Sequence, residues 1–380
     1  MHMVLMKIVL IGNYTADGQQ SMSRYAVLLH RELTKRGHSV DLITPTVCVR
    51  HLLPQRHRLA KWLGYADKYL LFRLNFARRI RNADLVHVCD HSNSPYLVWC
   101  KRKPKIITCH DAFGIRSALG HYVQNPTRAS GRWLQRWILN SLSYADRIVY
   151  VSEKTREDFT HVLSINVPSD VILHALNWSY GPCTGDELER ALALLGLKAG
   201  AYLLHVGGNQ WYKNRLGVLR AFQEIKKHDR YSRLKLVMAG KPFTSAMKVW
   251  MQQQSLSDVI ELTEISNEQL QVLYSGAMAL LFPSLEEGFG WPLLEAQACN
   301  CPVITSNRAP MTQIAGTGAV YLNPERPETA VAALDAITAH RDELISAGRE
   351  NLRRFTADEM ISRYEAAYEK VLRDCGARVE

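Results

Sequence analysis

Short apolar runs of strand length recur along the 380-residue chain, with stretches of helical periodicity between them. This alternation predicts α/β architecture with parallel sheets. In the first half we expect strands near Lys7–Gly12, Val40–Thr44, Leu85–Cys89, Lys105–Cys109, Arg147–Ser152 and Val171–His174. In the second half we expect them near Tyr202–Gly207, Leu234–Ala239, Val259–Leu262, Ala277–Phe282, Val303–Thr305 and Ala319–Leu322. Two such sets predict two doubly wound domains.

The same pattern predicts where the domains divide. The polar stretch Tyr180–Asp186 contains two glycines and a proline and is the expected linker. We therefore expect one domain over 1–179 and a second over 180–357. A last amphipathic helix, about Asp358–Arg373, falls in the remaining segment, 358–380. Because ligands of such folds bind beyond the carboxyl ends of the strands, the functional residues should follow the predicted strands.

The most informative segment is FPSLEEGFGWPLLEA, residues 282–296. Here a predicted strand leads into a turn of Gly288, Phe289 and Gly290, and then into a helix with Pro292 near its first position. Free N–H groups and the helix dipole would favour a phosphate at this turn. Glu287 and Glu295 bracket the turn and can accept hydrogen bonds from hydroxyls on either side of that phosphate. A ligand with hydroxyls on both sides of a diphosphate is a nucleotide sugar.

At these residues the chain resembles the retaining glycosyltransferases of family 4, also called glycosyl transferases group 1. The mark of that family is two glutamates with seven residues between them, the spacing of Glu287 and Glu295. The resemblance implies the GT-B fold, in which two Rossmann-like domains face each other across a cleft and the last helix returns to the first domain. It also implies that Glu287 orients the donor sugar and Glu295 the ribose diol. A structural turn flanked by solvated glutamates is the alternative reading.

The segment after the strand Tyr202–Gly207 matches the family's diphosphate site, where an arginine and a lysine hold the donor. Lys213 and Asn214 fall in register with the family's Lys-Asn, whereas Gly208 stands at the arginine position. One cation is therefore missing. By this resemblance, donor contacts are expected from Gly207, Gly208, Lys213 and Asn214, with Arg215 as a further candidate to stabilise the leaving group.

Two further places match the family pattern, and a third departs from it. His110-Asp111 follows a predicted strand, and the resemblance implies that His110 contacts the donor sugar, with a structural role as the alternative. Thr263–Asn267 corresponds to the nucleobase loop, where Ile265 is the expected packing partner. The third is a loop where the family carries two glycines and this chain carries polar side chains. These could bind the acceptor or the diphosphate, or simply form a turn: Gln19, Gln20 and Ser21.

No cofactor and no metal ion are expected. His87, Asp90 and His91 form a polar cluster in the sequence, but their spacing fits no particular metal geometry. By resemblance, the donor diphosphate would itself take up the acceptor's proton, so a divalent cation is not required. A nicotinamide dehydrogenase fits less well, because Gly12 opens no G-x-G-x-x-G run.

Positive charge is concentrated in the first half of the chain. The net charge is +11, and Lys and Arg outnumber Asp and Glu by 25 to 12 in residues 1–180. From Arg50 to Arg81, cations alternate with residues that we expect to form one buried helix face: Trp62, Tyr65, Tyr69, Phe72, Phe76 and Ile80. The cations suggest attachment to an anionic lipid surface or to a phosphate-bearing acceptor. No nucleic-acid-binding module is visible, so no nucleic-acid partner is expected.

The expected location is the cytoplasm. No apolar run approaches the roughly 20 residues needed to cross a bilayer, and the first residues do not read as a signal peptide. The eight scattered cysteines also fit a reducing compartment. Attachment to the inner face of the cytoplasmic membrane stays open.

We expect the acceptor to be a cell-envelope polysaccharide or a lipid-linked intermediate of its biosynthesis, with a small-molecule acceptor left open. Two alternatives to a transferase also remain. One is an epimerase or phosphorylase of the same fold. The other is a non-catalytic nucleotide-sugar-binding protein. Two departures from the family pattern favour it, namely Gly208 and the loop of Gln19, Gln20 and Ser21.

Overall fold

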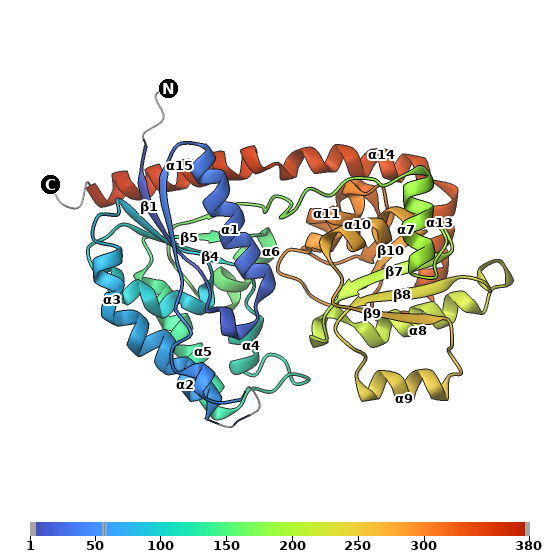
Figure 1. Ribbon diagram of the computed structural model, residues 1–380, viewed down its shortest axis with the longest axis horizontal. Coiled ribbons are helices and arrows are strands. Elements are labelled where there is room, and N and C mark those ends of the chain that lie inside the picture. The colour runs from blue at the N-terminus through green and yellow to red at the C-terminus, as the bar shows by residue number, and fades with distance from the viewer. Residues whose placement is uncertain (1–4, 55–56, 58, 377–380) are drawn as a thin grey trace. The chain divides into compact units, whose positions relative to one another are not determined.

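The computed structural model describes residues 5–54, 57 and 59–376, and these divide into two compact units (Figure 1). Unit 1 combines the chain up to Asn177 with the segment that begins at Ala357, and unit 2 comprises Trp178–Thr356. The division at Asn177–Trp178 lies just before the predicted linker. Each unit contains one six-stranded parallel sheet, as the alternation of apolar and helical stretches predicted. The predicted fold class, two Rossmann-like α/β domains, is confirmed.

In unit 1 the strands pair in the order β2-β1-β3-β4-β5-β6. Their bounds are Lys7–Ile11 (β1), Ser39–Ile43 (β2), Leu85–Val88 (β3), Lys105–Cys109 (β4), Arg147–Tyr150 (β5) and Ser169–Val171 (β6). The position predicted for the last strand, Val171–His174, was wrong by two to three residues. This edge strand is only half-buried, whereas the buried apolar residues Ile172 and Ala175 lie beyond its end. These two residues are therefore buried by packing against other parts of unit 1 and do not belong to the paired strand.

The helices of unit 1 cover both faces of its sheet (Figure 1). They are Gln20–Lys35 (α1), Ala60–Ala66 (α2), Phe72–Arg79 (α3), Phe113–Ala118 (α4), Ala129–Ser141 (α5), Glu153–Glu157 (α6) and Ala357–Gly376 (α15). The long helix α15 packs on this unit through buried polar contacts. His87 on β3 bonds through Nδ1 to the Tyr368 hydroxyl at 2.8 Å, and His38 Nε2 lies 3.1 Å from Glu365 Oε1.

The expected aromatic stripe is only partly buried. A π-helical turn, Asp67–Leu71, joins α2 to α3. After this turn Phe72, Phe76 and Ile80 are buried, as predicted, but Trp62 before it is 56% exposed. The prediction for Trp62 was therefore wrong. A π-turn holds more residues per turn than an α-helix, so positions before and after it do not keep one α-helical face. Arg56 and Arg58 of the same stretch lie outside the described residues.

In unit 2 the strand order is β12-β11-β10-β7-β8-β9. The strands are Tyr202–Gly207 (β7), Lys235–Gly240 (β8), Val259–Thr263 (β9), Ala279–Phe282 (β10), Val303–Ser306 (β11) and Ala319–Leu322 (β12). The helices are Gly185–Leu194 (α7), Arg215–Lys226 (α8), Ser245–Gln253 (α9), Asn267–Gly276 (α10), Trp291–Ala298 (α11), Met311–Ala315 (α12), Thr329–Ala339 (α13) and Arg341–Leu352 (α14). The order reverses between β7 and β10, and ligands of doubly wound sheets bind at such a reversal.

Two further observations concern the helices and the cysteines. Among the described residues, no helix combines the length and the apolar character needed to cross a bilayer. All eight cysteines fall within the described residues, and all are free thiols.

Candidate active site

The segments that follow β7 and β10 meet at the strand reversal of unit 2. Gly207 ends β7, and a short 3-10 turn, Trp211–Lys213, precedes α8. After β10 the chain passes through Ser284 and Glu287 to the glycine turn before α11. The two strands are parallel neighbours, with Ala279 opposite Leu203. Residues that lie far apart in the sequence are thereby gathered at one edge of the sheet.

Lys213 and Glu287 form an ion pair at this edge. Lys213 Nζ donates to Glu287 Oε1 at 2.7 Å, and the Ser284 hydroxyl donates to the same oxygen at 2.8 Å. The Glu287 side chain is 6% exposed and that of Lys213 is 17% exposed. The Nζ atom also lies 5.1 Å from the centre of the Phe282 ring. The carboxylate is therefore held in one orientation, with a cation beside it.

Asn214 fixes the position of Lys213. Its backbone is left-handed, with φ of 53°, and it joins the 3-10 turn to α8. Its side-chain amide donates to the carbonyl oxygens of Pro283 at 2.9 Å and Pro324 at 3.1 Å. The amide thus ties the lysine turn to the loop after β10. Contact of Asn214 with a donor stays a prediction.

The glycine turn leads into α11 as the sequence predicted. Gly290 has φ of 106°, a conformation that side chains rarely adopt, and Pro292 stands in the first turn of the helix. Phe289 is buried and packs edge-on against Trp291 and Phe355, with ring centres 6.1 Å apart in each case. Gly288 lies between these anchored residues and Glu287. The turn is therefore held by packing on both sides.

Glu295 lies in α11 and is also buried. Its Oε2 accepts a hydrogen bond from the Tyr274 hydroxyl on α10 at 2.8 Å. Burial, and then the charge of Glu295, raise the pKa of Tyr274 well above its usual value, so the phenol stays a neutral donor. The sequence pattern gave no signal for Tyr274, because it precedes Glu295 by 21 residues on another helix.

At Gly208 the space that a side chain would enter is occupied by the side chain of Gln210. A Cβ atom added there would meet the side-chain amide of Gln210. Arg215, the first residue of α8, is buried, and its Nη1 donates to the Lys241 carbonyl at 2.7 Å and to Asn209. Burial lowers the pKa of Arg215, and the charge of Glu261 opposes that shift. Its Nε and Nη2 atoms have no hydrogen-bond partner among the described residues.

His205 is a further polar residue at this edge, and sequence analysis missed it. It lies within β7, is fully buried, and donates from Nδ1 to the Leu281 carbonyl at 3.0 Å. Burial lowers its pKa to about 3, and Arg215 and Lys213 add to the effect. The ring is therefore neutral. Nothing in the apolar pattern of a buried strand distinguishes such a histidine from a core residue.

The loop before α10 holds Ile265, the expected nucleobase contact. Ile265 is half-buried, and the next residue, Ser266, forms a capping box with Gln269 at the start of the helix. The loop is therefore ordered by its own hydrogen bonds. The role of Ile265 stays a prediction.

In unit 1 His110 directly follows β4 and is enclosed. Its Nε2 donates to the Cys89 carbonyl at 2.8 Å, so its Nδ1 accepts from His174 Nε2 at 3.1 Å. Burial lowers the pKa of His110, although the charge of Asp90 opposes the shift. Both ring nitrogens are thus engaged within the unit, an arrangement that suits the structural alternative. Contact with a donor sugar stays a prediction.

The predicted loop of Gln19, Gln20 and Ser21 is exposed at the start of α1. Asn13, which follows β1, donates from Nδ2 to Gln19 and to Asp90, which follows β3. This link falls at the strand reversal of unit 1, between β1 and β3. The loop is thereby joined to a buried carboxylate.

The polar cluster predicted around His87 is not one site. His87 bonds to Thr108 and Tyr368, whereas Asp90 bonds to Asn13 and the Ser92 backbone and lies 3.2 Å from His91 Nδ1. Within the part of the chain that the structure describes, no three His, Cys, Asp or Glu residues come together as metal ligands would.

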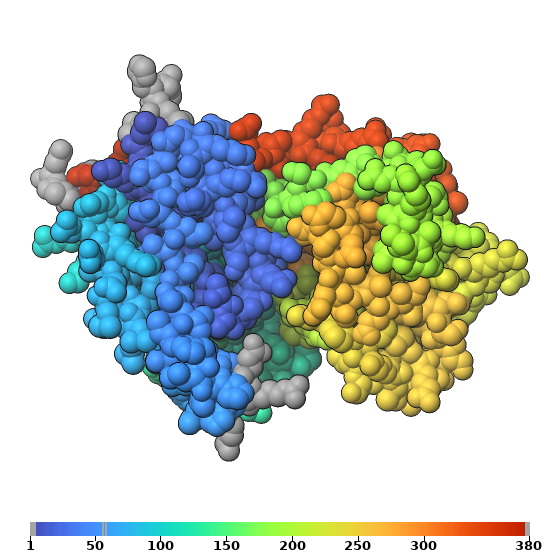
Figure 2. Space-filling model, viewed as in Figure 1, coloured from blue at the N-terminus to red at the C-terminus, as the bar shows by residue number. Residues whose placement is uncertain are grey.

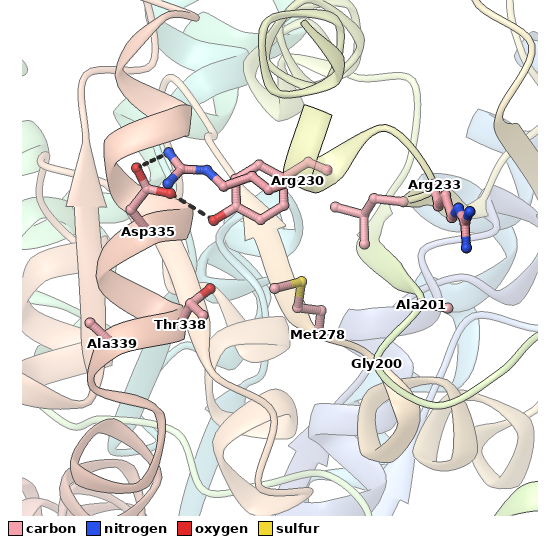
Figure 3. A pocket seen from close by; sticks show the side chains of 10 residues that line it. Gly200, Ala201, Arg230, Arg233, Met278, Asp335, Thr338 and Ala339 are labelled. Carbon is pink, nitrogen blue, oxygen red and sulfur yellow. Dashed lines mark hydrogen bonds and ion pairs between the residues drawn. The ribbon is translucent and has the colours of Figure 1, made fainter. Parts of the chain in front are cut away.

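A separate hollow of about 560 Å³ lies at the opposite end of the unit 2 sheet (Figure 3). It is lined by residues that precede β7, β8 and β10, among them Gly200, Arg233 and Met278. On one wall Asp335 pairs with Arg230 at 2.6 Å and accepts from the Tyr231 hydroxyl at 2.7 Å. Since ligands of these folds bind at the carboxyl ends of the strands, this hollow is not the predicted donor site.

Comparison with solved structures places the fold in a known class. A sucrose-phosphate synthase from Thermosynechococcus elongatus superposes with a TM-score of 0.74 at 20% identity, covering 97% of this chain and all of that one. The Anabaena protein HepE, solved in complex with UDP and glucose, superposes with a TM-score of 0.71 at 12% identity, over 96% of this chain and 99% of that one. The two sheets with their helices are those of the GT-B class.

Two family profiles match the sequence. The profile described as Glycosyltransferase Family 4 covers residues 22–177, and the one described as Glycosyl transferases group 1 covers residues 196–354. The chain belongs to these group 1, family 4 glycosyltransferases.

Curated relatives carry more specific names. An O-antigen chain mannosyltransferase B from Escherichia coli is 28% identical over 215 residues, 55% of this chain and 54% of that protein. The O-antigen chain mannosyltransferase RfbU from Salmonella typhimurium is 33% identical over 162 residues, 42% and 44% of the two chains. A Xanthomonas oryzae protein, named GDP-mannose:cellobiosyl-diphosphopolyprenol alpha-mannosyltransferase, is 25% identical over 300 residues, 75% and 71%. The chain spans about half the length of the first two relatives.

Proposed function

We propose that the protein is a retaining glycosyltransferase that moves a hexose from a GDP- or UDP-linked sugar to an acceptor hydroxyl. One observation carries this proposal: the Lys213–Glu287 ion pair lies beside the Gly288–Gly290 turn, at the strand reversal of unit 2. A cation and the start of a helix suit a diphosphate. The buried carboxylates suit the hydroxyls on either side of it.

In this proposal Lys213 and the start of α11 stabilise the diphosphate as it leaves the sugar. Electrostatic groups that act on a leaving group in the transition state contribute about 10²–10³ in rate. Glu287 orients the sugar hydroxyls and Glu295 the ribose diol, while Ile265 packs against the base. The leaving diphosphate takes the acceptor's proton on the same face of the sugar. The proposed reaction therefore needs neither a divalent cation nor a cofactor besides the donor.

Unit 1 would serve the acceptor side in this scheme. His110 would position the transferred sugar, and Gln19, Gln20 and Ser21 would contact the acceptor or the diphosphate. Since His110 is enclosed by Cys89 and His174, its proposed role is to support the wall of the site and not to transfer a proton.

The names of the relatives favour mannose and a bacterial glycan. Two are O-antigen chain mannosyltransferases, and a third is named for GDP-mannose and a diphosphopolyprenol acceptor. We therefore propose GDP-mannose as the first donor to test. A cell-envelope polysaccharide or a lipid-linked intermediate, glycosylated in the cytoplasm, is the proposed acceptor.

A thermal-shift series with GDP, UDP and their common sugar conjugates tests the donor, with and without EDTA. We expect stabilisation by one nucleotide series, unchanged by EDTA, followed by release of nucleoside diphosphate when acceptor is added. Absence of any stabilisation would contradict the proposal. Loss of the shift with EDTA would overturn the metal-independent mechanism.

A second candidate is a nucleotide-sugar-binding protein without activity, and the lack of a side chain at Gly208 favours it. The same series separates the two. Stabilisation by a nucleotide sugar without release of nucleoside diphosphate, across lipid-linked and soluble acceptors, would favour the binding protein.

A further inference from the structure

Five aromatic side chains form a continuous row in unit 1, from α2 to α5, exposed at its two ends and half-buried in the middle. Neighbouring ring centres lie 4.8–6.0 Å apart, in the order Trp62, Tyr65, Tyr69, Trp137 and Trp133. The two ends of the row are open to solvent, since Trp62 is 56% exposed and Trp133 is 66% exposed. We call these five residues the aromatic row. Figure 1 shows α2, α3 and α5 together on unit 1, and residues of α2 reach the surface in Figure 2.

Leucines extend this apolar surface along the same helical segment. Leu70 and Leu74 follow Trp62 at intervals of eight and twelve residues, and Leu74 is 77% exposed. Leu70 is 67% exposed as well, so both leucines add exposed apolar surface, Leu70 on the π-turn and Leu74 on α3. Single exposed leucines are ordinary, but a contiguous apolar surface marks a binding site.

The segments that carry the aromatic row have a large excess of positive charge. From Arg50 to Arg81 the sequence has a single acidic residue, Asp67, and α5 has none. Exposed cations stand next to the row, namely Lys61 and Arg73 on one segment and Arg132 and Arg136 on α5. Lys61 Nζ lies 5.5 Å from the centre of the Tyr65 ring. Aromatic rings flanked by exposed Lys and Arg are typical of side chains at the headgroup level of a membrane.

The surface is formed in advance. The Asp67 carboxylate is buried and accepts hydrogen bonds from the Tyr14 hydroxyl at 2.6 Å and from the backbone N–H of Val49 at 2.8 Å. It also accepts from the N–H groups of Cys48 and Arg50, each at 3.1 Å. These bonds fix the π-turn on the body of unit 1. The helix need not fold on contact, so its apolar face is presented without an ordering cost.

We propose that the aromatic row, with Leu70 and Leu74, binds the headgroup region of an anionic lipid bilayer. Trp and Tyr would lie at the headgroup level with the leucines below them, and the cations would pair with lipid phosphates. Charge complementarity selects this occupant, because exposed cations stand beside the row and the one exposed carboxylate that acts on Tyr69 among the described residues, Asp17, is paired with Lys68 at 2.7 Å. The inference does not depend on the proposed transferase activity.

Co-sedimentation with vesicles tests the proposal. One set contains phosphatidylglycerol and phosphatidylcholine, and the other contains phosphatidylcholine alone. Each cation near an anionic surface tightens binding about fivefold, so we expect at least tenfold preference for the anionic set, lost at high salt. Equal binding to both sets would overturn the proposal.

Matched variants locate the surface. Leu74→Ser and the pair Trp62→Ser with Trp133→Ser should each weaken binding to anionic vesicles by about tenfold. Leu194→Ser, at a leucine that is 89% exposed on α7, should leave it unchanged. The pair Arg132→Glu with Arg136→Glu should abolish binding at low salt, whereas Arg220→Glu on α8 should not. If the aromatic and charge variants bind vesicles as the parent does, the surface is wrongly assigned.

Further measurements keep the test decisive. Every substituted side chain is exposed, and an unchanged melting temperature would show that the variants fold. Preference for a DNA duplex over anionic vesicles would overturn the assignment of a lipid partner, as would binding only to another protein. The nucleotide thermal shift, measured on the same variants, should equal that of the parent. A variant that loses vesicle binding but keeps the nucleotide thermal shift would show that this surface binds lipid independently of the donor site. Absence of the nucleotide thermal shift in the parent would contradict the transferase proposal only.

Discussion

Lys213 Nζ lies 2.7 Å from Glu287 Oε1, and this pair links the chain after β7 to the chain after β10 across 74 residues of sequence. Both side chains are largely buried. Because little water reaches them, each charge is neutralised mainly by the other. A buried pair that loses one partner leaves an uncompensated charge, which is costly. A bound diphosphate would replace Glu287 as the ion-pair partner of Lys213. The Glu287 carboxylate could then accept hydrogen bonds from the sugar hydroxyls.

Replacing the lysine should therefore affect both binding and turnover. We expect Lys213→Ala to reduce the rate of sugar transfer by about 10²–10³ and to weaken binding of nucleoside diphosphate more than that of the nucleoside. Initial rates and calorimetric titrations check this. Lys248→Ala, at an exposed position of α9, serves as the control. Parent-like rates for Lys213→Ala would remove the lysine from the proposed mechanism.

The hydrogen bond from Tyr274 to Glu295 predicts a specific change in ribose recognition. Without the phenol, the carboxylate loses a donor that contributes about 1.5–3 kcal/mol, and its orientation is less restricted. We expect Tyr274→Phe to reduce the preference for ribose over 2′-deoxyribose nucleotides about tenfold, with a smaller effect on diphosphate affinity. Tyr321→Phe removes a hydroxyl that bonds to the Gly316 carbonyl in the same unit and should leave the preference intact. An unchanged preference in Tyr274→Phe would show that Glu295 does not contact the ribose.

Gly208 offers a gain-of-function test. Introducing the cation that the family carries there should tighten binding of nucleoside diphosphate, by a factor that corresponds to about 1.5–3 kcal/mol. Because a Cβ atom at 208 meets the flexible end of Gln210, the substitution Gly208→Arg is best combined with Gln210→Ala. Gly208→Met with Gln210→Ala matches the bulk without the charge. Equal affinities of the two double variants would mean that position 208 does not face the diphosphate.

The buried histidines of unit 1 predict acid sensitivity. Burial lowers the pKa of His87 to about 3, and the neighbouring His110 adds to the effect. In the unfolded chain a histidine has a pKa near 6.5, so below about pH 6.5 the unfolded state binds more protons than the folded state. The stability that comes from keeping His87 neutral is present above that pH and declines as the pH falls toward 3. At about pH 5 the loss from His87 is about 2 kcal/mol.

Urea unfolding at about pH 7.5 and about pH 5 measures this loss. We expect His87→Gln to be less stable than the parent at the higher pH but to lose less on acidification. His340→Gln, at an exposed histidine, should behave as the parent does. An identical pH dependence in the parent and in His87→Gln would assign the acid sensitivity to other groups, with His110 and His174 as the next to test, because burial lowers the pKa of both.

The strands were predictable because strands buried on both faces of a parallel sheet are continuous apolar runs. The edge strand β6 lacks that signature, and its predicted position was wrong. Trp62 was misplaced for another reason: periodicity along the sequence assumes one kind of helix, and the π-turn at Asp67–Leu71 breaks that assumption. The π-turn is held by bonds from residues 48–50, which no local pattern reveals.

The candidate site was predictable only where its residues stand close together in the chain. Glu287, the glycine turn and Glu295 form one segment with a recognisable order of strand, turn and helix. The contacts of Lys213, Tyr274 and Arg215 join distant segments, and only the strand order of the sheet brings them together. Polar residues inside strands, such as His205, carry no pattern at all. The roles assigned to the site residues remain predictions for the experiments above.

Helix α15 has a consequence for how the chain is made. Unit 1 is built from the first 177 residues and from a segment that begins at Ala357, whereas unit 2 is continuous in sequence. During synthesis, unit 2 has all of its residues outside the ribosome before unit 1 has its last helix. Until then Tyr364 and Tyr368 are absent, and the faces of Tyr25 and His87 that they cover stay open. Of these two units, the one whose translation starts earlier is therefore the last that can be completed.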